Sequence, residues 1–223
     1  MNNQVSDNPV EKNRHLPPLV ILSGLMITCY LTAEVMSVKQ LALWGVTWFD
    51  AGTIIFPATY MLSDVLTEVW GFRTMRRVIW LAFCCMLIFV GMAWLGVWLP
   101  YPSETESIAA AYKTVYSFVP RIVGASLLAF LLGELLNAWL MERIKVWTQG
   151  RHLWLRSVGS SALGYIVDTT VFVWVAFGGV LPVKDLWSMI FIQVPFKLLI
   201  TFLLATPAVY VLVRKVRKSL QNA

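Results

Sequence analysis

Seven ionisable residues lie inside long apolar stretches of this 223-residue sequence, where charge is costly. They are Glu34, Asp64, Glu68, Arg121, Glu134, Asp168 and Lys197. At the centre of a membrane-spanning helix each such group costs about 2.5–3.5 kcal/mol. We therefore expect these side chains to face a protein interior, where they are paired, hydrated or neutral. A mixture of acids and bases at several depths favours a binding pocket over the selectivity ring of an oligomeric pore.

The stretches that must position these residues are long enough to cross a bilayer, which takes about 20 mostly apolar residues. With 58% hydrophobic and 13% charged residues, the composition is typical of membrane proteins. We predict an all-α polytopic membrane protein, with six transmembrane helices in one bundle over residues 17–213, a polar tail at 1–16 and a basic tail at 214–223. The expected spans are 18–38, 51–69, 76–99, 117–140, 156–178 and 188–212, with a short surface helix at 104–114. The second span contains Pro57, so two alternatives stay open for it: a continuous helix or a broken one.

Lysine and arginine are unequally distributed between the two ends of these spans. Thirteen fall at one set of ends and three at the other, so the positive-inside rule predicts that both termini are cytoplasmic. The thirteen are Lys12, Arg14, Arg73, Arg76, Arg77, Arg143, Lys145, Arg151, Arg156, Arg214, Lys215, Arg217 and Lys218, and the three are Lys39, Lys113 and Lys184. Because the bases follow span ends rather than forming a patch with aromatic residues, we expect no nucleic-acid partner.

Asp168 and Lys197 are expected at nearly the same depth in the bilayer. At about 1.5 Å of rise per residue, Asp168 lies about 18 Å above the cytoplasmic end of its span and Lys197 about 16 Å above it. We therefore predict that the two side chains face one central cavity and pair there.

Four-residue spacing places further polar groups beside one another. Tyr60, Asp64 and Glu68 share one helical face, and Gln193 lies one turn before Lys197. This spacing predicts that polar side chains of the second and sixth spans face the same interior.

Simpler structural roles stay open for three of the charged residues. Glu68 is compatible with solvation beside the cationic segment Arg73–Arg77. Glu134 and the nearby Asn137 are compatible with hydrogen bonds between helices. Arg121 is compatible with a side chain that extends to the membrane boundary.

Motifs for cofactor or metal chemistry are missing from the sequence. It holds no glycine-rich phosphate loop, and its two histidines, His15 and His152, lie outside the predicted spans. Its cysteines, Cys29, Cys84 and Cys85, lie in apolar runs without a histidine nearby, which favours packing over metal or redox chemistry. We expect no cofactor, no metal and no enzymatic activity.

The run AGTIIFPATYMLSDVLTEVWGF (51–72), followed by Arg76 and Arg77, resembles the hallmark of the queuosine precursor transporter family, also called the vitamin uptake transporter family. Further matches are Arg121 with Ala125-Ser126, the segment Ser160 to Asp168, and the pair Phe196-Lys197. The resemblance covers roughly residues 18–215. The chain departs from the family in the first span, where Glu34 precedes Lys39 and the family usually has an asparagine.

This resemblance implies uptake of queuosine precursors, that is 7-deazaguanine bases or queuine, across the inner membrane. A carboxylate accepts both N–H donors of a guanine-like edge, a basic or amide group donates to its carbonyl, and aromatic rings stack on its faces. The candidate substrate-binding residues are Asp168, Lys197, Asp64, Glu68, Arg121, Gln193, Glu34, Tyr60, Phe56, Tyr165 and Phe196.

The expected mechanism is alternating access around a central site, either coupled to protons through Asp168 or Glu34 or uncoupled. Two other functions stay open: a substrate-binding subunit that needs a separate ATP-driven module, and an intramembrane enzyme. The expected partners are a small-molecule base and the lipid bilayer, with a homodimer as an open alternative.

Overall fold

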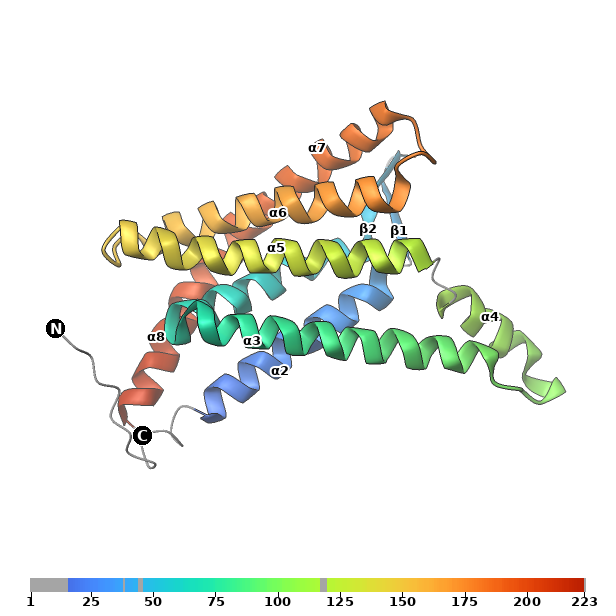
Figure 1. Cartoon of the computed structure of the whole chain (residues 1–223), viewed down its shortest axis with the longest axis horizontal. Coiled ribbons are helices and arrows are strands. Elements are labelled where there is room, and N and C mark those ends of the chain that lie inside the picture. Colours follow the sequence, from blue (N-terminus) through green and yellow to red (C-terminus); the bar gives the residue numbers. More distant parts are fainter. Residues whose placement is uncertain (1–15, 38, 44–45, 117–119, 223) are drawn as a thin grey trace.

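The computed structural model describes residues 16–37, 39–43, 46–116 and 120–222, and it is built mainly of long helices (Figure 1). The elements are α2 (Leu16–Ser37), β1 (Gln40–Leu43), β2 (Val46–Asp50), a 3-10 turn η1 (Ala51–Ile54), α3 (Phe56–Trp98), a 3-10 turn η2 (Ser103–Thr105), α4 (Glu106–Tyr116), α5 (Pro120–Trp147), α6 (Leu153–Phe177), α7 (Val183–Ile200), a π-helical turn η3 (Thr201–Ala205) and α8 (Thr206–Asn222). Five of the described helical runs are long and apolar enough to cross a membrane. The chain is therefore a helical polytopic membrane protein, as predicted.

Helix α3 contains a sharp reversal at Gly71. A straight helix of 43 residues would be about 65 Å long, twice the hydrocarbon thickness. Gly71 instead has φ 79° and ψ 168°, a conformation that a side chain would strain. In Figure 1 the first arm of α3 (56–70, cyan) meets the second arm (72–98, green) beside α8. The two arms correspond to the second and third predicted spans.

Pro57 lies in the first turn of α3, where its missing N–H costs no helical hydrogen bond. Of the two alternatives left open for the second span, the structure therefore shows the continuous helix over 56–70. The expected surface helix is present as α4.

The last predicted span is part of a longer helical run that begins at Val183 and continues through η3 to the end of α8. Pro195 lies inside α7, and the π-helical turn begins six residues later, at Thr201. Such turns change the direction in which later side chains face. The basic segment expected as a tail is helical to Asn222.

A short antiparallel hairpin, β1–β2, lies in a segment for which no strand was predicted. It packs near α7, and the Phe49 ring of β2 lies 4.3 Å from the Phe196 ring of α7. In Figure 1 the hairpin lies at the same end of the bundle as the connection between α6 and α7.

Helices α5 and α6 run side by side with very little separation at two glycines. A Cβ on Gly133 would lie 3.2 Å from the carbonyl oxygen of Gly164, and a Cβ on Gly164 would lie 3.2 Å from that of Gly133. Tyr60, from the first arm of α3, closes the space between them, because its ring would lie 2.7 Å from a Cβ on Gly164. The crossing thus brings α3, α5 and α6 into one interior.

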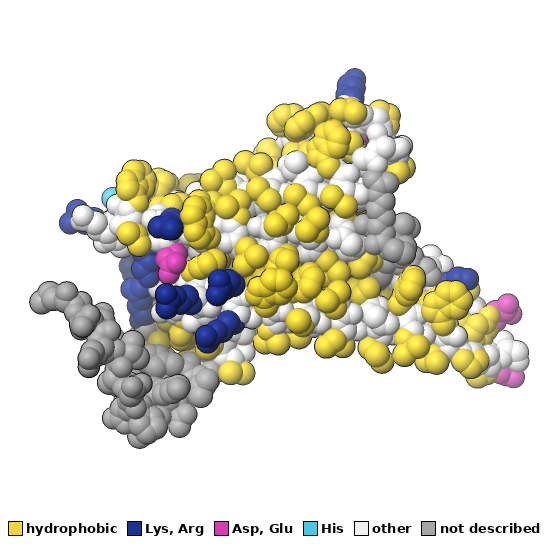
Figure 2. Space-filling view, viewed as in Figure 1, with side chains coloured by type: hydrophobic (Ala, Val, Ile, Leu, Met, Phe, Trp, Pro, Cys, Tyr) yellow, Lys and Arg dark blue, Asp and Glu magenta, His cyan; other side chains and the backbone are white. Residues whose placement is uncertain are grey.

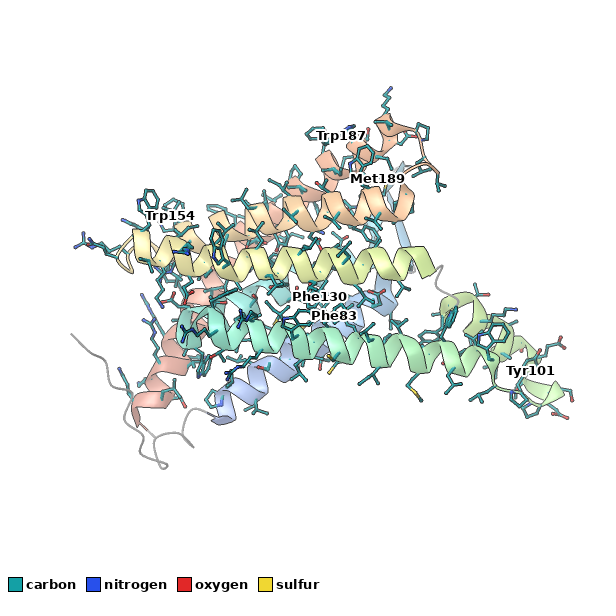
Figure 3. The ribbon with its side chains drawn as sticks, viewed as in Figure 1. Phe83, Tyr101, Phe130, Trp154, Trp187 and Met189 are labelled. Carbon is teal, nitrogen blue, oxygen red and sulfur yellow. The ribbon has the colours of Figure 1, made fainter. Side chains whose placement is uncertain are left out.

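The flanks of the bundle are apolar and one end is strongly basic. Figure 2 shows hydrophobic side chains along the flank, with lysine and arginine gathered beside the α3 reversal, the α5–α6 connection and α8. We call this end the basic end; its exposed cations are Arg73, Arg76, Arg77, Arg143, Arg151, Arg214, Lys215, Arg217 and Lys218. Figure 3 places Trp154 at the basic end and Tyr101 and Trp187 at the other, as expected of side chains at the two membrane interfaces.

Replacing Gly133 with alanine should destabilise the bundle. The added methyl would lie 2.8 Å from both the Asp168 Cβ and the Tyr60 hydroxyl, so an overpacking cost of about 1–3 kcal/mol is expected. Thermal unfolding in detergent measures the loss. Gly124→Ala is the matched control on the same helix, because its new Cβ has open space. Equal melting temperatures for the two variants would contradict the close crossing.

Candidate functional site

Asp168 of α6 and Lys197 of α7 form a buried ion pair inside the bundle. The Lys197 Nζ atom lies 3.0 Å from Asp168 Oδ2 and donates a second hydrogen bond, of 3.2 Å, to the Thr169 hydroxyl. Each charged residue is only 4% exposed. The pairing inferred from helix depth is thus present, and two opposite charges offset part of each other's desolvation cost.

Aromatic rings enclose this pair. Lys197 Nζ lies 4.5 Å from the ring centroid of Phe56 and 5.7 Å from that of Tyr165. Tyr165 stacks on Tyr60 at 4.2 Å and hydrogen-bonds the Thr201 hydroxyl at 2.8 Å. A planar polar ligand can stack on flat rings of this kind while its polar edge meets the charged pair.

Two further candidates lie close to the pair on α7. Gln193 is buried one turn before Lys197, and Phe196 is half-buried against Phe49 of the hairpin. The structure therefore brings five candidates into contact, and Gln193 and Phe196 flank Lys197 on α7; the five are Asp168, Lys197, Phe56, Tyr60 and Tyr165.

A second polar layer lies one turn along α3 from Tyr60, and we call it the Asp64 layer; its members are Ser63, Asp64, Glu134, Asn137 and Ser157. Asp64 accepts hydrogen bonds from Asn137 Nδ2, at 3.2 Å, and from the Ser157 hydroxyl. Glu134 is fully buried, and neither of its carboxylate oxygens has a hydrogen-bond partner among the described residues. The predicted role of Glu134 and Asn137 in joining helices is confirmed only for Asn137.

A third polar layer, the Glu68 ion cluster, lies at the basic end. Arg156 binds the buried Glu68 carboxylate with two nitrogens, Nε to Oε2 at 3.0 Å and Nη2 to Oε1 at 2.9 Å. Lys145 and Arg217 also contact Glu68 Oε1, at 3.2 and 2.6 Å. Of the two alternatives left open for Glu68, solvation beside Arg73–Arg77 does not hold, because the side chain is buried on the same helical face as Asp64.

The Glu68 ion cluster borders a cavity of about 280 Å³. The cavity lies between α3, α6 and α8, and its lining includes Glu68, Arg156, Arg214, Arg217 and Tyr210. Arg156 is held in place on its other side, where Nη1 donates to the carbonyls of Gly150 and Arg151 at 3.0 and 2.9 Å. Fixed cations surround a single buried carboxylate here.

Two candidates are not gathered with the others. Glu34 lies near the far end of α2 and accepts a hydrogen bond of 2.9 Å from the Ser126 hydroxyl of α5. The Arg121 side chain lies outside the part of the chain that the structure describes. Their expected roles in substrate binding stay predictions.

Sequence reasoning missed several contributors to these layers. Arg156 was counted among the loop cations, although it begins an apolar run and is 3% exposed. The Ser157 hydroxyl donates a hydrogen bond to Asp64, and the Thr169 hydroxyl accepts one from Lys197. An isolated serine or threonine in a sequence gives little sign of such a role. The hairpin residue Phe49 had no signal either, since one aromatic residue does not predict a strand.

The chain is similar to proteins of a known family. Residues 50–212 match the family described as "Putative vitamin uptake transporter". The chain belongs to the vitamin uptake transporter family. The family match spans both arms of α3, the Asp168–Lys197 pair and the Asp64 layer, and it includes the Glu68 ion cluster except for Arg217. No solved structure shows a significant match to the chain.

Three curated relatives carry transporter names. The chain is 32% identical over 176 residues, 78% of its length and 74% of the relative's, to "Probable queuosine precursor transporter" of Bacillus subtilis. It is 27% identical to "Queuosine precursor transporter" of Escherichia coli, over 59% of this chain and 55% of the relative. It is also 27% identical to "Probable queuosine precursor transporter" of Haemophilus influenzae, over 78% and 72%. These names indicate a transporter rather than an enzyme.

Replacing Glu68 with glutamine should strongly destabilise the protein. The change removes the carboxylate from buried Arg156, and breaking such a pair typically costs about 3–5 kcal/mol. Thermal unfolding in detergent provides the measurement, with the exposed Glu106→Gln on α4 as the control. A Glu68→Gln protein as stable as the control would show that the cluster is solvated.

Proposed function

We propose that this member of the vitamin uptake transporter family imports queuosine precursors, that is 7-deazaguanine-type bases, through a site centred on Asp168 and Lys197. The observation that carries the proposal is the buried ion pair enclosed by the rings of Phe56 and Tyr165. The names of the three relatives support the substrate class. Since the relatives are bacterial, the membrane is the inner membrane.

The chemistry of the pair matches the edge of a 7-deazaguanine. The ring N–H and the exocyclic amine donate to the Asp168 carboxylate, and Lys197 donates to the neighbouring carbonyl oxygen. The base takes the place of the direct contact between the two charges, so neither is left unpaired in an apolar interior. The rings of Phe56 and Tyr165 stack on its faces.

The orientation follows from the basic end, which faces the cytoplasm by the positive-inside rule. Six crossings result: α2, the first and second arms of α3, α5, α6 and the α7–α8 run. The Glu68 ion cluster then closes the site on the cytoplasmic side, because it ties the ends of α3, α5, α6 and α8 together. Alternating access requires this cluster to separate when the substrate is released.

Asp168→Asn should reduce the affinity for queuine or its 7-deazaguanine precursors at least about tenfold. The reason is that a hydrogen bond from an N–H group of the base to a charged carboxylate is worth about 1.5–3 kcal/mol. Binding to the purified protein by calorimetry measures the change. Asp185→Asn, at the exposed start of α7, is the matched control. Wild-type protein that binds none of these bases would overturn the substrate assignment, and full affinity in Asp168→Asn would overturn the site.

Uptake by the chain alone separates a carrier from a subunit that needs an ATP-driven module. Proteoliposomes that hold only this protein should take up the radiolabelled base, and Asp168→Asn should abolish uptake. Protein that binds the base but takes up none would indicate the substrate-binding subunit instead.

A further inference from the structure

We propose that Glu134 is the proton-carrying group that couples uptake to the proton gradient. This inference rests on the proposed transport function and adds its energy source. Glu134 stands on α5 next to Gly133, at the crossing of α5 and α6. No substrate or structural contact described so far uses its carboxyl group.

Glu134 differs from every other buried acid in the described part of the chain. Asp168 is paired with Lys197, and Glu68 is paired with three cations. Asp64 and Glu34 each accept hydrogen bonds from neighbouring side chains. Glu134 alone among them is fully buried with both carboxylate oxygens lacking a hydrogen bond in that part of the chain. An ionised carboxylate in such a place costs several kcal/mol, whereas a protonated one does not.

The described titratable groups that interact with Glu134 from the neighbouring helices are carboxyl groups and tyrosine hydroxyls. Tyr30 of α2, Tyr60 and Asp64 of α3, and Tyr165 and Asp168 of α6 lie within electrostatic reach of it.

Two buried cations stand near this interior, and both are already bonded: Lys197 of α7 pairs with Asp168, and Arg156 of α6, which acts on Asp64, pairs with Glu68. Arg121 stands thirteen residues earlier on the same helix, about 20 Å along its axis, and is too far to neutralise Glu134. If Asp64, Glu134, Asp168 and Lys197 were all ionised, these four groups together would carry a net negative charge, and a proton on Glu134 lowers it.

Asn137 offers a hydrogen-bond acceptor for a proton carried by Glu134. Its Nδ2 group donates to Asp64, so its Oδ1 atom is an acceptor, and that atom is buried without a donor among the described residues. Glu134 lies within side-chain interaction range of Asn137 and Ser63. A protonated Glu134 supplies this missing O–H donor, and the Ser63 hydroxyl, which is also buried without a partner among the described residues, can bond the other carboxyl oxygen.

The position also gives a route for coupling to the substrate. A Cβ on Gly133 would lie 2.8 Å from Asp168 Cβ, so the neighbouring Glu134 shares one interior with the substrate carboxylate. A proton on Glu134 removes a like charge from the vicinity of Asp168 and favours the ionised form that accepts the base. When the site opens to the more alkaline cytoplasm, Glu134 loses the proton, and repulsion between the two carboxylates favours release.

A metal ion suits this place less well than a proton. Among the described residues no group of three or more histidine, cysteine or acidic side chains is arranged to hold one. A sodium ion remains the rival that an experiment must separate, since hydroxyl, amide and carboxylate oxygens also bind it.

The test compares wild type with the isosteric Glu134→Gln in proteoliposomes whose interior is alkaline. Wild type should accumulate the radiolabelled 7-deazaguanine base at least tenfold, and a protonophore should abolish the accumulation. Glu134→Gln should bind the base and exchange it across the membrane at equilibrium, yet fail to concentrate it. Glu106→Gln, exposed on α4, should behave as wild type.

Several results would overturn the inference. One is concentration of the base by Glu134→Gln as strong as by wild type, and another is wild-type accumulation that follows a sodium gradient instead of a proton gradient. Infrared spectroscopy gives a readout that needs no substrate: the C=O band of a protonated carboxyl should be lost in Glu134→Gln and kept in Glu106→Gln. Persistence of the full band in Glu134→Gln would refute a protonated Glu134 even if the substrate assignment had failed.

Discussion

The cost of placing charge inside an apolar bundle is the constraint on which the rest of this structure depends. Lys197 and Asp168 lie far from water, so each needs the other, and the Thr169 hydroxyl supplies one further hydrogen bond. A buried pair of this kind contributes little net stability over an apolar core. Its presence therefore favours a functional explanation, since leucine or phenylalanine would have packed there at lower cost.

The first arm of α3 organises the three polar layers. It carries three polar residues spaced one helical turn apart: Tyr60, Asp64 and Glu68. Each contributes to a different layer, in order from the centre of the bundle to the basic end. Its partners come from α5 and α6 at every level and from α8 at the last. A helix with such a polar face cannot lie against lipid, which explains why this arm is buried among the others while the second arm exposes apolar side chains along its length.

Much of this arrangement was predictable because helical rise and bilayer thickness are fixed quantities. They predicted the apolar spans, the surface helix α4 and the common depth of Asp168 and Lys197. They could not predict the partners of Glu68, because Arg217 lies 149 residues away in the sequence and Arg156 sits at a span boundary. Nor could they predict that Gly71 alone reverses α3, since a glycine permits a left-handed conformation without requiring it. Contacts between distant segments depend on how helices rotate against one another, and local spacing carries no information on that rotation.

The location of the Glu68 ion cluster gives it a property that a hydrophobic plug would lack. While the basic end is closed, the carboxylate is dry and its contacts with Arg156, Lys145 and Arg217 are strong. Once the helix ends begin to separate, water enters and the same contacts weaken toward the roughly 0–1 kcal/mol of an exposed ion pair. Opening therefore becomes easier as it proceeds, because the separated charges are hydrated. Such a cluster favours two distinct states, closed and dry or open and wet, over intermediate ones. The alternating-access mechanism proposed above needs that behaviour, since a partly open end would let the proposed coupling proton leak without the substrate.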